Sequence, residues 1–132
     1  MTLQVTDLTL SIADKRLCSQ LNIEFKPGEF WGIMGVNGIG KTTLLHSLAA
    51  LHPVNSGSIH LNDKVVNHYP RLSLAQKIGL MLQEYEYSFP CTVLEAALIG
   101  RHPFIKRWQW EDKHDQELAM QALKQVGLEA LV

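Results

Sequence analysis

Hydrophobic and polar residues alternate along the first part of the chain, over residues 3–10 and again over residues 21–25. A period of two is typical of a β-strand with one buried and one solvated face. In the first stretch the alternation predicts two faces, Leu3, Val5, Asp7 and Thr9 on one and Gln4, Thr6, Leu8 and Leu10 on the other. Both stretches are therefore predicted to be half-buried antiparallel strands.

Two later stretches are apolar without alternation. Residues 26–29, KPGE, predict a turn, and they lead into residues 30–35, FWGIMG. Residues 77–82, KIGLML, show a similar pattern. Continuous apolar runs of this length are typical of strands covered on both faces, so we expect two buried strands here. A further alternating strand, IHLND, is expected after the turn NSGS at residues 55–58.

Helical patterns dominate the second half of the chain, after a first helix over residues 41–51 that Pro53 ends. Ser73 with Gln76, and Thr92 with Glu95, have the spacing of capping boxes that open helices. The second of these helices should end near Gly100, because Pro103 follows. Residues 111–126 predict an amphipathic helix, with one apolar face made by Leu118, Ala119, Ala122, Leu123 and Val126.

Composition narrows the class of protein. A chain of 132 residues with 46% hydrophobic content can bury one core. Its 12 basic and 13 acidic residues are spread along the sequence, so no basic patch predicts binding to nucleic acid or to anionic lipid. The pattern contains neither a membrane-spanning stretch nor an export signal. Cys18 and Cys91 lie far apart in sequence, which fits reduced thiols of a cytosolic protein.

The candidate chemistry lies between the apolar run and the first helix. Residues 35–42, GVNGIGKT, match the phosphate-binding pattern Gly-x-x-x-x-Gly-Lys-[Ser/Thr] in the strand-to-helix context that it requires. Glycines allow backbone N–H groups to turn toward phosphate oxygens, and the helix N-terminus adds a positive dipole end. The predicted nucleotide-binding residues are Gly35, Val36, Asn37, Gly38, Ile39, Gly40, Lys41, Thr42 and Thr43. Lys41 should reach the β- and γ-phosphates, and the Thr42 hydroxyl should bind Mg²⁺.

Many unrelated enzymes use such a loop, so its surroundings must decide the family. Here a long antiparallel pattern precedes the loop, and the guanine-binding signature of GTPases is absent. The chain resembles the ATP-binding subunits of ABC transporters over all 132 residues. The resemblance rests on PGEFWGIMGVNGIGKTTLL at the loop, SGSIHLND in the following strand, IGLMLQE, and TVLEAALIGRHPF at the start of a helical region.

This resemblance implies an α/β fold: part of a RecA-like P-loop NTPase core with an N-terminal antiparallel β subdomain, and the beginning of an α-helical subdomain. Residues 1–90 would hold the first two parts of this incomplete domain and residues 91–132 the helical part. The ligands implied are ATP and Mg²⁺. Gln83 would be the Q-loop glutamine, whose carbonyl meets the metal or the attacking water. The sequence GRHP at residues 100–103 is similar to the subgroup that serves iron-siderophore, haem and cobalamin uptake.

The sequence also departs from the family pattern. Ile12 stands where an aromatic residue commonly stacks on adenine, so phosphate contacts should dominate binding. After Gln83 nothing resembles the signature sequence, the Walker B carboxylates or the switch histidine. We therefore expect this chain alone not to hydrolyse ATP. A noncatalytic nucleotide-binding or interaction module, docking through residues 85–110, and a part of a soluble ABC protein of repair or translation remain alternatives.

The implied partners are the membrane subunits of a transporter and a second nucleotide-binding subunit in a head-to-tail dimer. The implied location is the cytoplasmic face of the inner membrane. None of the six histidines recurs with a carboxylate at metal-ligand spacing, so we expect no metal site among them. Trp108 and Trp110 either pack on the adjacent helix or form an exposed partner contact. Tyr85, Tyr87 and Phe89 similarly either bear on a membrane subunit or anchor their loop.

Overall fold

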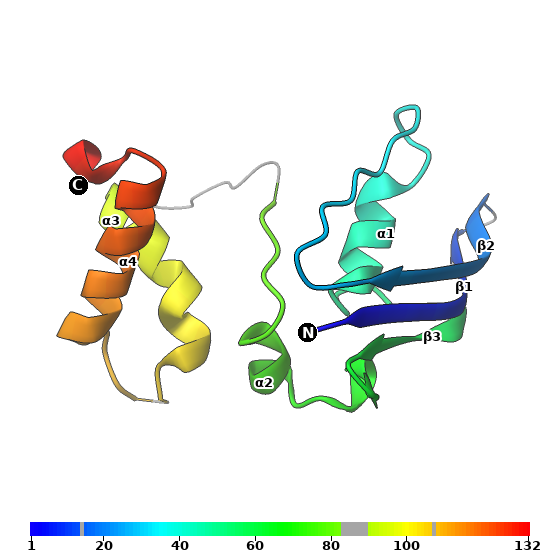
Figure 1. Ribbon diagram of the computed structural model, residues 1–132. Coiled ribbons are helices and arrows are strands. Elements are labelled where there is room, and N and C mark those ends of the chain that lie inside the picture. The colour runs from blue at the N-terminus through cyan, green and yellow to red at the C-terminus, as the bar shows by residue number, and fades with distance from the viewer. Residues whose placement is uncertain (14, 83–89, 107) are drawn as a thin grey trace. The chain divides into compact units, whose positions relative to one another are not determined.

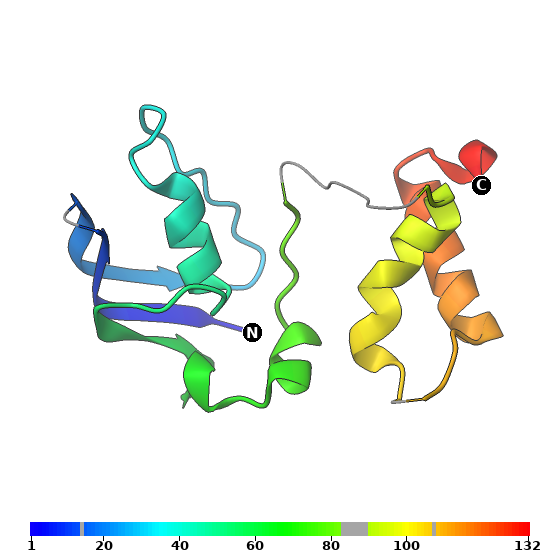
Figure 2. The ribbon, with the colours of Figure 1, turned by 180° about the vertical axis from the view of Figure 1, so that it is seen from behind.

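The computed structural model describes residues 1–13, 15–82, 90–106 and 108–132. The chain forms two compact units, Met1–Leu74 and Ala75–Val132. Figure 1 and Figure 2 show strands and helices in the first unit and helices in the second. Each unit is described by itself below.

The first unit is built on a four-stranded antiparallel sheet with the strand order β2-β1-β3-β4 (Figure 1). Its strands are β1 (Leu3–Ile12), β2 (Lys15–Phe25), β3 (Ser56–Leu61) and β4 (Lys64–Val65), and the short helix η1 (Val66–His68) follows. The sheet and η1 bury an aliphatic core of Val5, Leu8, Leu10, Ile59, Leu61 and Val66. Burial of such side chains contributes about 1.5–3 kcal/mol each. The antiparallel pairing predicted for the N-terminal strands is confirmed.

The predicted faces of the first strand are wrong, because β1 changes phase at Asp7. Asp7 has φ 47°, and the pairing with both β2 and β3 shifts register at this point. Two β1 residues then oppose one β3 residue, as in a β-bulge, so Val5 and Leu8 are both buried although they lie three positions apart. Asn22 holds the bulge, since its Oδ1 accepts from the Asp7 N–H at 2.9 Å.

Residues 30–35 do not form the predicted buried strand. Phe30 and Met34 are almost fully exposed, at 102% and 94%. Among the described residues every strand pair belongs to the antiparallel sheet, so this segment has no neighbour for a ladder. It is instead attached through Trp31, whose ring meets Phe25 edge-on at 5.1 Å and whose Nε1 donates to Glu29 at 2.9 Å.

The segment at residues 77–82 is likewise not a strand, and Met81 is 90% exposed. A continuous apolar run predicts burial, but burial requires strands or helices on both sides. Among the described residues of each unit, neither residues 30–35 nor residues 77–82 have strands or helices on both sides. The two predicted buried strands are therefore corrected to extended segments outside any ladder.

Helix α1 (Lys41–Leu48) begins where the pattern predicts and ends three residues earlier than expected. Ala50 takes the left-handed conformation with φ 57°. The Leu51 N–H donates to the His46 carbonyl at 2.8 Å, and the Ala50 N–H donates to the Ser47 carbonyl at 2.9 Å. This bonding pattern is a Schellman motif, so the helix is ended by its own C-cap before Pro53 is reached.

Helix α2 (Arg71–Ala75) places Ser73 inside the helix, so the capping box predicted for Ser73 and Gln76 is wrong. The helix starts directly after Pro70, whose carbonyl accepts from the Leu74 N–H at 3.0 Å. Proline presets a helical φ and lacks the N–H that a first turn leaves without a partner. Gln76 instead donates to the Pro103 carbonyl at 2.7 Å.

The second unit contains α3 (Val93–Leu98), η2 (Ile99–Phe104), α4 (Lys113–Gln125) and η3 (Glu129–Leu131). The capping box of Thr92 and Glu95 is confirmed, with both reciprocal hydrogen bonds present. The backbone N–H of Thr92 is the chief reason that the pKa of Glu95 lies below its usual value. Helix α4 has a similar box made by Asp112 and Asp115, which the sequence analysis missed.

The predicted apolar face of α4 is correct only in part. Ala119 and Leu123 are buried, whereas Ala122 is exposed and Val126 is 67% exposed. Val126 lies at the C-cap, beyond the last helical residue, so it no longer follows the helical period. The buried stripe is therefore narrower than the sequence pattern predicts.

A partly buried ion pair joins η2 to α4 and predicts that the second unit is sensitive to acid. Arg101 Nε donates to Asp115 Oδ1 at 2.8 Å, and this bond is the main cause that holds the pKa of Asp115 below its usual value. A lowered carboxyl pKa stabilises the fold above the unfolded value and loses that effect as pH falls through the folded value. We expect hydrogen-exchange protection of α4 to fall as pH drops below about 4. The Asp115→Asn variant should be less protected at neutral pH and should lack this acid step; an unchanged step would contradict the assignment to Asp115.

Candidate nucleotide-binding site

In the first unit, the predicted phosphate-binding residues form a loop at residues 35–40, after the extended segment, and the first turn of α1 at residues 41–43 (Figure 1). Gly38 and Gly40 adopt positive φ values of 75° and 108°. L-residues with a Cβ rarely occupy such conformations, so the sharp turn of the backbone depends on these two glycines. Gly35 does not have a positive φ, but a Cβ there would lie 3.1 Å from Ile39 Cγ2. Its role in this structure is therefore close packing within the loop.

Leu17 of β2 supports the loop from the sheet side. A Cβ at Gly40 would lie 2.7 Å from Leu17 Cδ1. The β1–β2 register shifts between the pairs Leu10–Cys18 and Ser11–Arg16, which leaves Leu17 as the extra residue of a β-bulge. The irregular strand thus brings an aliphatic side chain against the last glycine of the loop.

Lys41, the first residue of α1, folds back across the loop. Its Nζ donates to the carbonyl oxygens of Gly35 at 2.8 Å and Val36 at 3.0 Å. The contacts hold one full positive charge at the point where the extended segment becomes the loop. Phosphate oxygens would attract that charge more strongly than neutral carbonyls do.

The N-terminus of α1 is open to an anion. Gly40 is the N-cap, no side chain accepts a hydrogen bond there, and the first turn contains no acidic residue. The first N–H groups of a helix need acceptors and carry the positive end of its dipole. Thr42 is exposed and Thr43 half-buried in this turn. Open N–H donors, a lysine and a threonine hydroxyl fit the phosphates of ATP and an oxygen ligand for Mg²⁺.

A second lysine, which the sequence analysis did not select, also contacts the loop. Lys15, the first residue of β2, donates from Nζ to the Gly38 carbonyl at 3.0 Å. The two residues are 23 positions apart, and no local pattern links them. Lys15 and Leu17 belong to no sequence motif. They reach the loop because the sheet packs against it.

Ile12 lies at the end of β1, where it pairs with Lys15 across the hairpin. Since Lys15 contacts the loop, the hairpin that carries Ile12 lies beside the predicted phosphate-binding residues. Ile12 is 45% exposed. The expectation that phosphate contacts dominate binding, because Ile12 replaces a stacking aromatic residue, stays a prediction.

Gln83, Tyr85, Tyr87 and Phe89 lie outside the described residues. No group of three or more His, Cys, Asp or Glu side chains within the described ranges is placed to hold a metal ion. Cys18 and Cys91 are both free thiols, and Trp108 and Trp110 are 91% and 89% exposed.

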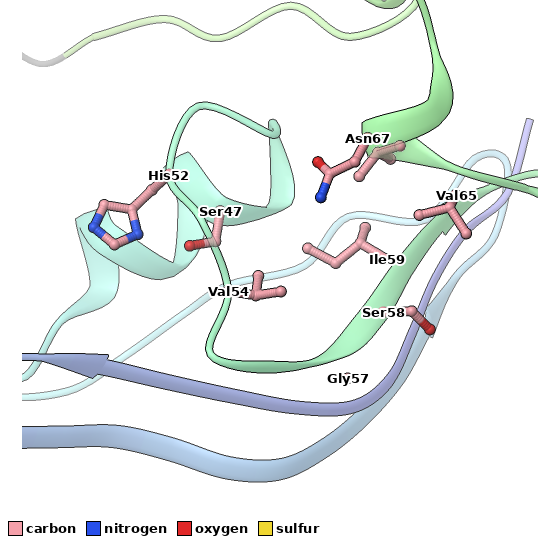
Figure 3. Close-up of a pocket in the computed structure, with 9 residues that line it drawn as sticks. Ser47, His52, Val54, Gly57, Ser58, Ile59, Val65 and Asn67 are labelled. Carbon is pink, nitrogen blue, oxygen red and sulfur yellow. The ribbon is translucent and has the colours of Figure 1, made fainter.

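A small cavity of about 50 Å³ lies beside the C-terminal end of α1, away from the loop (Figure 3). Ser47, Val54, Ile59 and Asn67 are among its lining residues, and they come from α1, β3 and η1 with the segments next to them. Ser47 is 1% exposed, and its hydroxyl has no hydrogen-bond partner among the described residues. The volume is far below the 300 Å³ or more of a typical small-molecule site, so the cavity is not a second nucleotide pocket.

Residues 18–132 match the ABC transporter family, and the chain belongs to that family. A relative in Escherichia coli K12, the ferric enterobactin transport ATP-binding protein FepC, is 35% identical over 87% of this chain and 44% of its own. The hemin import ATP-binding protein HmuV of Methylobacillus flagellatus is 34% identical over 95% of this chain and 46% of its own. The chain spans slightly less than half the length of these two curated relatives.

A solved structure confirms the fold class. It is described as an inward-facing, metal-chelate type ABC transporter and superposes with a TM-score of 0.81 at 30% identity. The match covers 98% of this chain and 46% of that one. The fold is therefore part of an ABC-type nucleotide-binding domain. Within the described residues, no helix has both the length and the apolar character needed to cross a bilayer.

Proposed function

We propose that this chain binds Mg-ATP through the loop at residues 35–43. The observation that carries the proposal is the position of Lys41, whose ammonium group lies against the loop carbonyls at the uncapped start of α1. Lys41 would exchange these carbonyls for β- and γ-phosphate oxygens, and the backbone N–H groups around Gly38 and Gly40 would cradle the phosphates. Thr42 would bind Mg²⁺, and Gln83 would reach the metal or the attacking water.

The intact protein would use this site to power transport across a membrane. Within the predicted class of iron-siderophore, haem or cobalamin, the names of FepC and HmuV, with the metal-chelate type of the solved neighbour, support an iron-siderophore or haem as the cargo. Its partners would be the membrane subunits and a second nucleotide-binding subunit. Binding to those subunits would place it on the cytoplasmic face of the inner membrane.

Replacing Lys41 tests ATP binding by this loop. We expect Lys41→Met to weaken Mg-ATP binding, measured by isothermal titration calorimetry, by roughly 10- to 100-fold, because a charge-assisted hydrogen bond to phosphate is lost. Lys77→Met is a matched control, since it removes an exposed lysine that does not belong to the loop. Equal affinities of the two variants would contradict the proposed site.

Hydrolysis is a separate question from binding. We propose that these 132 residues bind ATP without turning it over, since they contain no stretch like the signature or Walker B segments. Phosphate release by the purified chain should stay at the level of buffer. Hydrolysis that is lost in Lys41→Ala would refute this part of the proposal.

A further inference from the structure

The contact between Lys15 and the loop places a second positive charge beside the phosphate-binding residues. Lys15 Nζ lies 3.0 Å from the Gly38 carbonyl oxygen, whereas Lys41 Nζ lies against Gly35 and Val36. The two ammonium groups therefore meet different parts of one loop. They come from different elements, β2 and α1, and each donates to carbonyl oxygens of the loop.

The ammonium group of Lys15 has capacity for another partner. An ammonium group carries three N–H donors, and the Gly38 carbonyl accepts one of them. None of the ion pairs found between described residues includes Lys15, and its side chain is exposed. It can thus keep its bond to the loop and also donate to an anion bound there.

The neighbouring residue limits what else the hairpin can offer a nucleotide. Ile12 pairs directly with Lys15, and an aliphatic side chain cannot stack on a base as an aromatic ring does. The interaction that the hairpin offers at the loop itself is the charge of Lys15, whose Nζ contacts the Gly38 carbonyl. Phosphate groups attract that charge, whereas an uncharged base does not.

We propose that Lys15 is a phosphate-binding residue of this site, by which the β1–β2 hairpin holds the polyphosphate chain of the nucleotide. The inference rests on the proposed binding of ATP and extends it to a residue outside the loop. It predicts that binding follows the charge of the polyphosphate and depends little on the base. A base-free polyphosphate should therefore use Lys15 as ATP does.

The test compares Mg-ATP with Mg-tripolyphosphate, a probe without base or sugar. We expect Lys15→Met to weaken the binding of both ligands equally, by roughly three- to fivefold, as is typical for an exposed charge pair. Arg16→Met removes the adjacent exposed charge of the same strand and should stay within about twofold of the parent chain. The affinity of Lys15→Met should also depend less on salt concentration.

Lys15→Gln tests whether Lys15 acts through its charge or only through its hydrogen bond to the Gly38 carbonyl. Glutamine keeps an N–H donor for the Gly38 carbonyl but carries no charge, so it should bind as weakly as Lys15→Met, whereas Lys15→Arg should restore binding. Full affinity in Lys15→Gln, weakening of ATP alone, or equal behaviour of Lys15→Met and Arg16→Met would overturn the inference while the proposed function stands. A parent chain that binds neither ligand would overturn both.

Discussion

Gly57→Ala is expected to destabilise the first unit by about 3–5 kcal/mol, a large part of the 5–15 kcal/mol that usually holds a domain folded. An added Cβ would lie 2.4 Å from the Asp7 carbonyl oxygen and 2.5 Å from that of Thr6. Both atoms belong to the backbone of β1 at the bulge, so no side-chain rotation can relieve the overlap. Gly57 also has φ 84°, which adds strain for any residue with a Cβ.

Gly28→Ala provides the matched control for Gly57→Ala. Gly28 has a similar φ of 80°, but a Cβ there would meet nothing within 4 Å. We expect it to cost only about 1–2 kcal/mol, the price of the backbone conformation alone. Hydrogen exchange of β1 and β3 amides measures the first unit separately from the second. Similar losses of protection in the two variants would show that close approach of the strands at Gly57 is not what matters.

Gly40→Ala is expected to abolish measurable Mg-ATP binding while the first unit remains folded. A Cβ at this position would meet Leu17 Cδ1 at 2.7 Å and Cδ2 at 2.8 Å, and φ is 108°. The end of a leucine side chain can move aside, so the overlap costs little stability. The backbone cannot keep φ 108° with alanine without strain, and the turn that presents N–H groups at the start of α1 must change. Affinity should fall by roughly 100-fold or more.

Two variants separate the causes in Gly40→Ala. Gly32→Ala is the neutral control, because Gly32 has no positive φ and a Cβ there would meet nothing within 4 Å. The double variant with Leu17→Ala removes the side-chain overlap but leaves the backbone strain. We expect calorimetry to find no recovery of binding in the double variant. Recovery would show that the contact with Leu17, rather than the backbone conformation, shapes the loop.

Features specified by nearby residues were predicted well. Thr92 and Glu95 satisfy each other's backbone N–H groups across one helical turn, so their spacing is enough to identify the start of α3. The glycine spacing before Lys41 likewise predicted a loop that enters a helix, and Gly38 and Gly40 have the φ values that such a turn requires. These interactions span only a few residues, which a sequence pattern can contain.

Features that depend on distant residues were not predicted. The apolar run at residues 30–35 fits a buried strand, yet a strand exists only where a neighbouring ladder pairs with it. The alternation in β1 fits an uninterrupted strand, yet the bulge at Asp7 reverses its phase. Gly57 was assigned to a turn, whereas the structure places it inside β3, against the backbone of β1 at that bulge.

The amino-acid sequence by itself predicted the glycine turn that leads into α1, the antiparallel character of the N-terminal strands and the family. Each of these depends on short-range spacing or on a period that survives small irregularities. Only the tertiary structure decided which β1 residues are buried and which residues outside the motif meet the loop. Lys15 and Leu17 reach Gly38 and Gly40 because β2 packs beside the loop, and contacts between segments so far apart leave no local pattern.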